Sequence, residues 1–250
     1  MSARIFLPLF LRRGLLACAL LASSAAVMAQ QTNLLVAGGA GYRRPIEEVA
    51  KGFEATGGVK IERIYGHMGQ VLAQAHASGK VAVIFGEKDL FEKDATLHLA
   101  RVLTLGSGRL VLAWPKGRSF AALGDLAADD VRRIGMPDMK LAVFGKAARE
   151  SLEQSGLFSK LEPRLIVVPT VPQVSAWLQS GEVDAGFINL TEALAIRERI
   201  GGYVELPQSG YKPVQIAAGV LAGQESPALA AFVDYLQSPA AQEIFKRYGL

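Results

Sequence analysis

The chain has 250 residues, of which half are apolar and a fifth are charged. This balance is typical of a globular protein that buries a sizeable core, and it excludes a disordered chain. A chain of this length folds either as one large domain or as two modest lobes.

The first 29 residues have the pattern of an export signal. Arg4, Arg12 and Arg13 form a basic start, 14–27 is an apolar run, and Ala29 ends a cleavage site of small residues. We therefore predict cleavage after Ala29 and a periplasmic location. The apolar run is shorter than the roughly 20 residues that a membrane-spanning helix needs, which argues against a retained anchor.

The leader leaves the export route open between the Sec and twin-arginine pathways. The pair Arg12-Arg13 fits a twin-arginine signal, and the segment 15–18 loosely resembles a lipoprotein cleavage box that ends in Cys18. Lipidation at Cys18 is disfavoured, because almost no apolar sequence separates it from Arg13.

Removing the leader changes the charge and the cysteine count. The full chain has 27 Lys and Arg against 23 Asp and Glu, and three of the arginines leave with residues 1–29, so 24 basic residues remain and the net charge is about +1. This charge gives no support for binding to nucleic acid or to a membrane surface. Cys18 is the only cysteine, so the exported chain has no disulfide, no thiolate metal site and no cysteine nucleophile.

Apolar runs and glycine-rich turns alternate along the first third of the exported chain. Strands are predicted at 34–37, 59–65 and 81–85, and helices at 46–53 and 70–77. The run 81–85 is continuously apolar, as expected of a strand that is covered on both faces. Strands that alternate with helices predict an α/β fold with right-handed crossovers.

The remainder of the chain continues this alternation. Strands are predicted at 109–114, 165–168, 185–188 and 214–221, a strand or turn at 140–144, and helices at 126–134, 146–155, 174–178, 191–199, 228–237 and 239–248. Ser226-Pro227 and Ser238-Pro239 each combine an N-cap with a first helical residue. No flexible linker interrupts the chain, which favours two lobes joined by several crossings.

Four turns lead directly into predicted helices, at 40–42, 67–69, 143–145 and 170–172. Unpaired backbone N–H groups and the helix dipole make a helix start a binding site for anions without any formal cation. Converging starts of this kind predict a site for a small anion. Because strand-to-helix turns are rich in glycine throughout α/β folds, a purely structural role for these turns stays open.

Arg43 and Arg44 lie in the first turn of a predicted helix, where a cation is disfavoured by roughly 0.3 to 1 kcal/mol. Glu47 and Glu48, one turn further on, are the simpler explanation for these charges. A nearby anionic ligand is the other.

Catalytic and metal sites have little support in the sequence. The chain has no G-x-S-x-G, H-E-x-x-H or G-x-x-x-x-G-K-[ST] motif. The adjacent His67 and Met68 would suit copper(I), but two neighbouring ligands do not make a site, and His76 and His98 add no metal-like spacing. We therefore expect no enzymatic activity, no metal and no cofactor.

The C-terminal segment 232–249, FVDYLQSPAAQEIFKRYG, resembles the closing helices of the periplasmic molybdate-binding proteins of ABC importers almost residue for residue. The segments 53–57, 145–152 and 181–186 are also similar to that family, and the resemblance covers essentially the whole exported chain. It implies a two-lobed type II periplasmic binding protein fold that closes on its ligand like a hinge.

This fold implies how the chain divides. The first lobe is expected at 30–110 and is completed by about 214–250. The second lobe is expected at 111–213, with the ligand cleft between the two.

In that family, backbone N–H groups and neutral hydroxyls hold the dehydrated tetrahedral dianion. The resemblance places the family's two serine positions on Gly41 and Met68. It places two backbone donor positions on Phe144 and Val171, and a tyrosine hydroxyl position on Asn189. Both serine hydroxyls are therefore missing from this chain. The amide of Asn189 still provides a donor.

The missing hydroxyls matter for affinity. A hydrogen bond to a charged group contributes about 1.5 to 3 kcal/mol, so losing two weakens molybdate binding by two or more orders of magnitude unless other donors replace them. His67 is our best candidate for a replacement donor, Gln70 can also donate, and Arg43 can supply charge. Alternatively, the cleft suits a different oxyanion or a larger, less symmetric ligand.

The resemblance implies a monomeric binding protein that captures a small oxyanion such as molybdate or tungstate and delivers it to an ABC transporter permease in the inner membrane. No nucleic-acid partner is expected. Three alternatives stay open: a solute-binding protein for another oxyanion, a small organic anion or a metal; a periplasmic sensory or accessory module that binds a partner protein; and a periplasmic enzyme.

Overall fold

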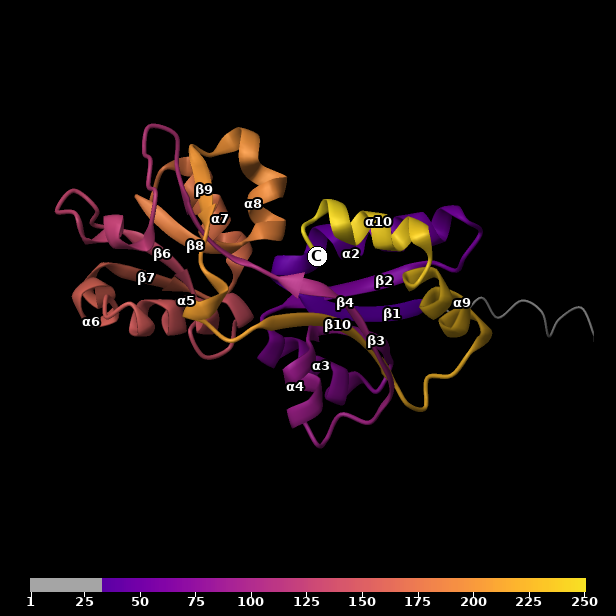
Figure 1. Ribbon diagram of the computed structural model, residues 1–250. Helices are drawn as coiled ribbons and strands as arrows, with labels where there is room; N and C mark the ends of the chain where they lie inside the picture. Colours follow the sequence, from indigo (N-terminus) through magenta and orange to yellow (C-terminus); the bar gives the residue numbers. More distant parts are fainter. Residues whose placement is uncertain (1–32) are drawn as a thin grey trace, which may run out of the picture. The chain divides into compact units, whose positions relative to one another are not determined.

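The computed structural model describes residues 33–250, and Asn33–Leu250 forms one compact unit (Figure 1). The export signal predicted at 1–29 lies outside the described residues. The unit contains two five-stranded sheets, each flanked by helices, and we call each sheet with its helices a lobe. The prediction of a two-lobed α/β fold is confirmed.

The first lobe is built on a mixed sheet with the strand order β2-β1-β3-β10-β4. Its strands are β1 (Leu34–Gly39), β2 (Ile61–Gly66), β3 (Val81–Glu87), β4 (Leu99–Gly108) and β10 (Val214–Leu221). The strand β1 is parallel to β2 and β3, whereas β10 is antiparallel to β3 and β4. The predicted crossover units therefore account for β1, β2 and β3. In this sheet β10 alone runs in the opposite direction, because β4 is antiparallel to β10 and so runs the same way as β3.

Helices cover both faces of this sheet. They are α2 (Arg43–Ala55), α3 (Met68–Ser78), α4 (Lys88–Lys93), α9 (Pro227–Leu236) and α10 (Pro239–Arg247). On one face, Phe53 of α2 and Phe85 of β3 both pack against Phe232 of α9. On the other, Ile84 belongs to a cluster with Phe91 of α4. Alternate residues of β3 thus face opposite layers, which is why this run is continuously apolar.

The second lobe repeats the arrangement with the strand order β7-β6-β8-β5-β9. Its strands are β5 (Leu110–Trp114), β6 (Ile134–Pro137), β7 (Leu165–Val168), β8 (Ala185–Asn189) and β9 (Gly202–Glu205). Here β6 is parallel to β7 and β8, and β5 is antiparallel to β8 and β9. The helices are α5 (Val143–Gln154), α6 (Phe158–Leu161), α7 (Val171–Ser180) and α8 (Leu190–Ile196).

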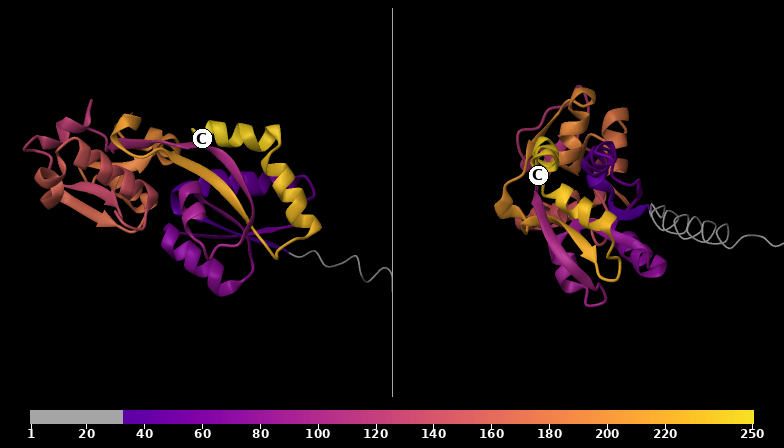
Figure 2. Two further views of the ribbon diagram at one scale, coloured as in Figure 1. Left: turned by 60° about the horizontal axis from the view of Figure 1, so that its bottom comes forward. Right: turned by 90° about the vertical axis from the view of Figure 1, so that its right-hand side faces the viewer.

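Short 3₁₀ turns link several of these elements, at Ala40–Tyr42, Leu123–Ala127, Glu162–Arg164, Arg197–Arg199 and Gln208–Gly210. The chain passes from one lobe to the other twice, between β4 and β5 and between β9 and β10 (Figure 2). In both lobes the parallel strands end at the side where the lobes meet. That side is where α/β sheets bind ligands, because turns and helix starts gather there.

The helix predicted at 126–134 is wrong. A 3₁₀ turn ends at Ala127, and Ile134 already begins β6. One arginine explains the difference, because Arg164 Nη1 donates to the carbonyl oxygens of Ala128 at 2.7 Å and Val131 at 2.8 Å. The segment thus satisfies its backbone carbonyls with a side chain, and helical hydrogen bonds are not needed.

Three strands were not predicted, namely β4, β6 and β9. The residues at 140–144, predicted as a strand or turn, form a turn that leads into α5. The two serine caps near the C-terminus are confirmed, since Ser226 Oγ accepts from the Leu229 N–H at 3.1 Å and Ser238 Oγ from the Ala241 N–H at 3.3 Å. Within residues 33–250, every helix is too short or too polar to cross a membrane.

Candidate ligand-binding cleft

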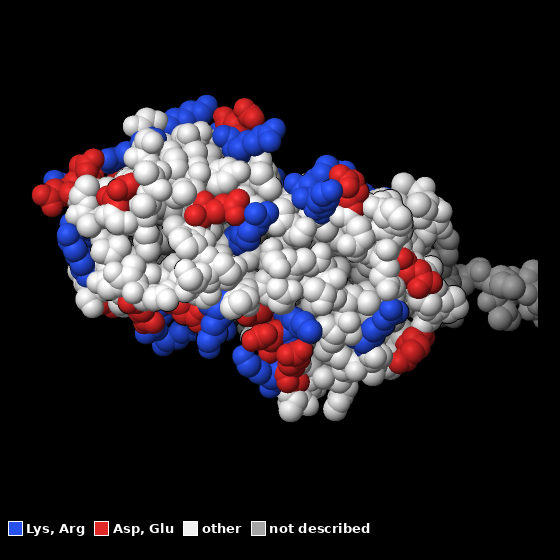
Figure 3. Space-filling model, in the orientation of Figure 1, with Lys and Arg blue, Asp and Glu red and all other residues white. Residues whose placement is uncertain are grey.

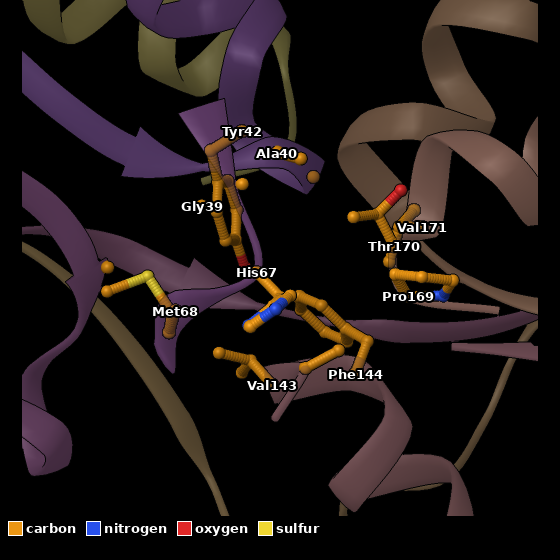
Figure 4. A pocket seen from close by; sticks show the side chains of 14 residues that line it. Gly39, Ala40, Tyr42, His67, Met68, Val143, Phe144, Pro169, Thr170 and Val171 are labelled. Atoms are coloured by element: carbon orange, nitrogen blue, oxygen red, sulfur yellow. The ribbon is translucent and has the colours of Figure 1, made fainter. Parts of the chain in front are cut away.

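A small cavity lies where the strand ends of the two lobes meet (Figure 4). Its volume is about 30 Å³. It is lined by Gly39, Ala40, Gly41, Tyr42, Gly66, His67, Met68 and Gly86 from the first lobe and by Ala142, Val143, Phe144, Pro169, Thr170 and Val171 from the second. All four turns singled out in the sequence contribute to this lining, so the structure brings them together.

Three of these turns are the starts of regular α-helices. The helix α3 begins after His67, α5 begins after Ala142, and α7 begins after Thr170. The turn after β1 differs, because a 3₁₀ turn at Ala40–Tyr42 precedes α2. Three helix dipoles therefore have their positive ends at this cavity, which is the environment that favours an anion.

The lining has no formal charge. It contains no Lys, Arg, Asp or Glu, and its titratable side chains are those of His67 and Tyr42. Its walls are largely apolar, with Met68 on one side, Val171 on the other, and Val143 and Phe144 next to each other at the start of α5 (Figure 4). Any anion held here would be bound by backbone dipoles and neutral donors, with little competition from water.

Five of the six residues predicted to bind ligand line the cavity: Gly41, His67, Met68, Phe144 and Val171. Asn189, the sixth, is completely buried at the end of β8, and its Nδ2 donates to the Gly41 carbonyl oxygen at 3.0 Å. Asn189 thus binds the backbone of the first-lobe turn from the second lobe.

A side chain at position 41 would project toward the second lobe. A Cβ built on Gly41 would lie 3.5 Å from Asn189 Oδ1 and 3.6 Å from Val171 Cβ. The carboxamide of Asn189 therefore lies beside the space into which a side chain at position 41 would project.

Met68 contributes to packing. Its side chain is 3% exposed and belongs to a first-lobe core cluster with Val71 and Phe91. A Cβ at Gly86 would lie 2.9 Å from the Met68 sulfur, so the thioether covers the end of β3. Among residues 33–250, no three His, Cys, Asp or Glu side chains gather into a group that would hold a metal ion.

His67 caps the helix α3 with its ring. The ring Nδ1 accepts a hydrogen bond from the Gln70 N–H at 3.2 Å. In a neutral ring the proton is then on Nε2, which makes Nε2 the donor. Gln70 is exposed and its side chain folds over Gly66, so it does not line the cavity.

The second-lobe turn opposite His67 is fixed by Asp138. Its Oδ1 accepts from the Lys140 N–H at 2.8 Å and from the Leu141 N–H at 2.7 Å. Burial raises the pKa of Asp138, but these two hydrogen bonds outweigh it and lower the pKa overall. Gly145 completes the turn, because a Cβ there would lie 2.1 Å from the Asp138 carbonyl oxygen.

The two arginines in the first turn of α2 have partners that the sequence did not suggest. Arg43 stacks over the ring of Tyr65 at 5.6 Å. Arg44 Nε and Nη2 each donate to a carboxylate oxygen of Glu192 at 3.1 Å, across the cleft. The explanation by Glu47 and Glu48 is therefore wrong, since those carboxylates pair with Arg63 and Arg247.

Tyr42 lies in the predicted turn at 40–42, and the sequence did not predict it as a ligand-binding residue. It is 3% exposed, and its ring packs against Phe144 of the second lobe with 6.0 Å between ring centres. Burial raises the pKa of Tyr42 well above its ordinary value, and the charge of Glu87 adds to this effect, so the hydroxyl stays protonated. No motif or periodicity in the sequence distinguishes this tyrosine from an ordinary core aromatic.

Comparisons with known proteins agree with this geometry. Residues 34–250 match the model of the family described as bacterial extracellular solute-binding protein. The molybdate-binding protein ModA of Azotobacter vinelandii is 28% identical over 243 residues, which cover 94% of this chain and 93% of that protein. ModA of Rhodobacter capsulatus is 27% identical over 247 residues, with 97% of each chain covered.

Solved structures give the same result. The periplasmic molybdate-binding protein of Azotobacter vinelandii superimposes with a TM-score of 0.79 at 25% identity, covering 87% of this chain and 98% of that one. The resemblance inferred from the C-terminal segment is confirmed over the whole described unit. The two-lobed fold and the cleft formed by helix starts agree with the family match over residues 34–250. The chain therefore belongs to the bacterial extracellular solute-binding proteins.

Proposed function

We propose that this protein is the periplasmic substrate-binding component of an ABC importer and that it binds a tetrahedral oxyanion such as molybdate or tungstate between its lobes. The observation that carries the proposal is the convergence of helix starts from both lobes on a cavity without formal charge. Ligand bound there contacts both lobes, so it favours the closed form that a permease receives. No covalent step is involved.

The size of the cavity supports a small ligand. A single water needs roughly 10 to 15 Å³ on the same measure. A volume of about 30 Å³ therefore suits a ligand of a few heavy atoms, and it argues against the larger ligand considered from the sequence. The apolar walls favour an ion that has lost its water and is held by fixed dipoles.

The proposed ligand-binding residues are Gly41, His67, Met68, Phe144, Val171 and Asn189. Backbone N–H groups at the helix starts supply most donors in this proposal, and His67 Nε2 adds a side-chain donor. Asn189 acts on the turn at Gly41, to whose carbonyl oxygen it is bonded.

One observation supports a second candidate, a solute-binding protein for an oxyanion other than molybdate or tungstate. The positions of both family serines are occupied by Gly41 and by Met68, whose side chain is committed to the core. The donor set thus differs from that of the family, and selectivity among oxyanions depends on the donor set.

The proposed setting is export through the leader at 1–29, followed by action as a monomer in the periplasm.

Acidic and basic side chains are interspersed over the face shown in Figure 3. Such a mixed surface is unlike the one-sided basic patch of a nucleic-acid-binding protein, which supports a small-molecule ligand.

A thermal-shift panel on residues 30–250 tests the proposal. The probes are molybdate, tungstate, sulfate, phosphate, perchlorate, copper(I) and small organic anions, with sodium chloride at equal ionic strength as the control. A ligand that binds only the folded state at 100 times its Kd adds about 2.7 kcal/mol, which raises the Tm of a chain of this size by roughly 5 to 10 °C.

A shift with molybdate and tungstate alone supports the first proposal. A larger shift with another oxyanion supports the second candidate. If no oxyanion shifts the Tm, the proposed oxyanion-binding function is wrong. A shift with copper(I) alone or with an organic anion alone would also contradict that function.

A further inference from the structure

Two polar atoms at the cleft are buried without a hydrogen-bond partner among the described residues. They are the hydroxyl oxygen of Tyr42 and Oδ1 of Asn189. Burying a polar group without a partner costs free energy, and most buried polar groups in folded proteins avoid it. The two groups lie near each other, since burial raises the pKa of Tyr42 and the Asn189 side chain opposes this effect. Of the two atoms, only the Tyr42 hydroxyl has a proton that an anion in the cavity could accept.

The Tyr42 hydroxyl is directed toward the cavity. Tyr42 belongs to the lining, and Figure 4 shows its ring extending from the first-lobe turn toward His67 and Phe144. The ring is held between the lobes by Phe144, with centres 6.0 Å apart. Gly108 leaves room for this contact, since a Cβ there would lie 2.5 Å from the Tyr42 hydroxyl oxygen and 2.9 Å from Phe144 Cζ.

Packing alone does not require the hydroxyl. A phenylalanine at this position would keep the contact with Phe144 and would bury no unpaired oxygen. The hydroxyl stays protonated because burial and the charge of Glu87 oppose its ionisation. It therefore offers a neutral O–H donor, the same kind of group as the hydroxyls that are missing at Gly41 and Met68.

We propose that the Tyr42 hydroxyl donates a hydrogen bond to the bound oxyanion and so determines, with the helix starts, which oxyanion the cleft holds. This inference rests on the proposed function of the cleft. It adds a donor from a position at which the resemblance to molybdate-binding proteins implies none.

Tyr42→Phe in protein expressed from the complete chain tests the inference. Dissociation constants for molybdate, tungstate, sulfate and phosphate are measured by calorimetry, and the ligand-free Tm is measured alongside. Tyr65→Phe is the matched control, because Tyr65 also buries a hydroxyl without a partner among the described residues but does not line the cavity. We expect Tyr42→Phe to weaken the best oxyanion by about ten- to hundredfold.

Tyr42→Phe should leave the ligand-free Tm unchanged or raised, and Tyr65→Phe should leave the Kd unchanged. If Tyr42→Phe binds as tightly as the wild type, the inference is overturned while the proposed function stands. A lowered ligand-free Tm with an unchanged Kd would mean that the hydroxyl stabilises the fold by interacting with the neighbouring Asn189 amide and does not bind the ligand. That result would also overturn the inference. If the wild type binds none of the four oxyanions, both the inference and the proposed function are overturned.

Discussion

Arg44 and Glu192 form an ion pair with two hydrogen bonds of 3.1 Å that joins the first lobe to the second beside the cleft. Glu192 is 4% exposed, and it also accepts from Ser175 Oγ at 2.8 Å. Because the partners belong to different lobes, the pair requires the lobes to be closed. It therefore stabilises the closed form without contacting the ligand.

Replacing Arg44 by Met should shift the protein toward its open form. The substitution leaves the Glu192 carboxylate buried without its cation, which is costly until the lobes separate and water reaches it. Because the binding-competent form is then less populated, we expect oxyanion affinity to fall about tenfold or more. Calorimetry measures the affinity, and small-angle scattering measures the ligand-free radius of gyration, which should increase.

Arg43→Met is the control for this experiment. It removes a charge from the same helical turn, but Arg43 stacks on Tyr65 within the first lobe. Equal affinities for the Arg44 and Arg43 variants would contradict a role of the ion pair in closure.

Restoring a hydroxyl at Gly41 should tighten oxyanion binding. The built Cβ makes only ordinary contacts of 3.5 Å or more, and Gly41 has no positive φ, so serine fits the backbone. A new hydrogen bond to a charged ligand contributes about 1.5 to 3 kcal/mol, which corresponds to a tenfold or greater gain. Calorimetry with Gly41→Ser and Gly41→Ala separates the hydroxyl from the added methyl. The idea fails if alanine and serine behave alike.

His67→Ser should weaken binding while preserving the helix. Serine is a good N-cap and can accept from the Gln70 N–H in place of the ring Nδ1. It removes the Nε2–H, so we expect a tenfold loss of affinity with a Tm close to that of the wild type. His67→Ala, which also removes the cap, should lower the stability by about 1 kcal/mol. Unchanged affinity in the serine variant would exclude His67 as a donor to the ligand.

Asp184→Asn should destabilise the second lobe in a pH-dependent manner. Asp184 Oδ2 accepts from the Arg132 and Arg133 N–H groups at 2.8 and 2.9 Å, and Oδ1 accepts from Arg118 at 2.6 Å. Burial raises the pKa of Asp184, but these hydrogen bonds outweigh it and lower the pKa. Because the pKa is lower in the folded state, the ionised Asp184 stabilises the fold at pH values above the unfolded-state pKa, which is near 3.9. This stabilisation is lost as the pH falls through the folded-state pKa.

We therefore expect Asp184→Asn to lower the free energy of unfolding by about 1 to 2 kcal/mol at pH 7. The difference from the wild type should shrink below about pH 4, as urea titrations at several pH values would show. Asp129→Asn, at an exposed position in the same region, is the control. A difference that does not change with pH would contradict this role for the Asp184 charge.

The sequence predicted best where one local signal decides the structure. The serine caps of α9 and α10 depend on a side chain and a backbone N–H three residues apart, so they are readable without tertiary structure. The same holds for the helix starts at the cleft. By contrast, β4 is irregular, with register shifts against β10 at two places, so it shows no clean alternation of apolar residues.

Contacts between distant residues account for what the sequence did not predict. The partner of Arg44 is 148 positions away, as is the contact between Asn189 and Gly41. The segment before β6 is held by Arg164, from far along the chain, and its local pattern favoured a helix. In each case the deciding group comes from another element, and short-range periodicity carries no information about it.

The place of β10 between β3 and β4 sets the order in which the lobes are completed. Its residues follow the whole second sheet in the chain, and β4 has no other neighbour in the first sheet. As the chain emerges from a ribosome or a translocation channel, the second lobe is available in full before β10 arrives. The lobe that begins first in the sequence is therefore the last to finish folding.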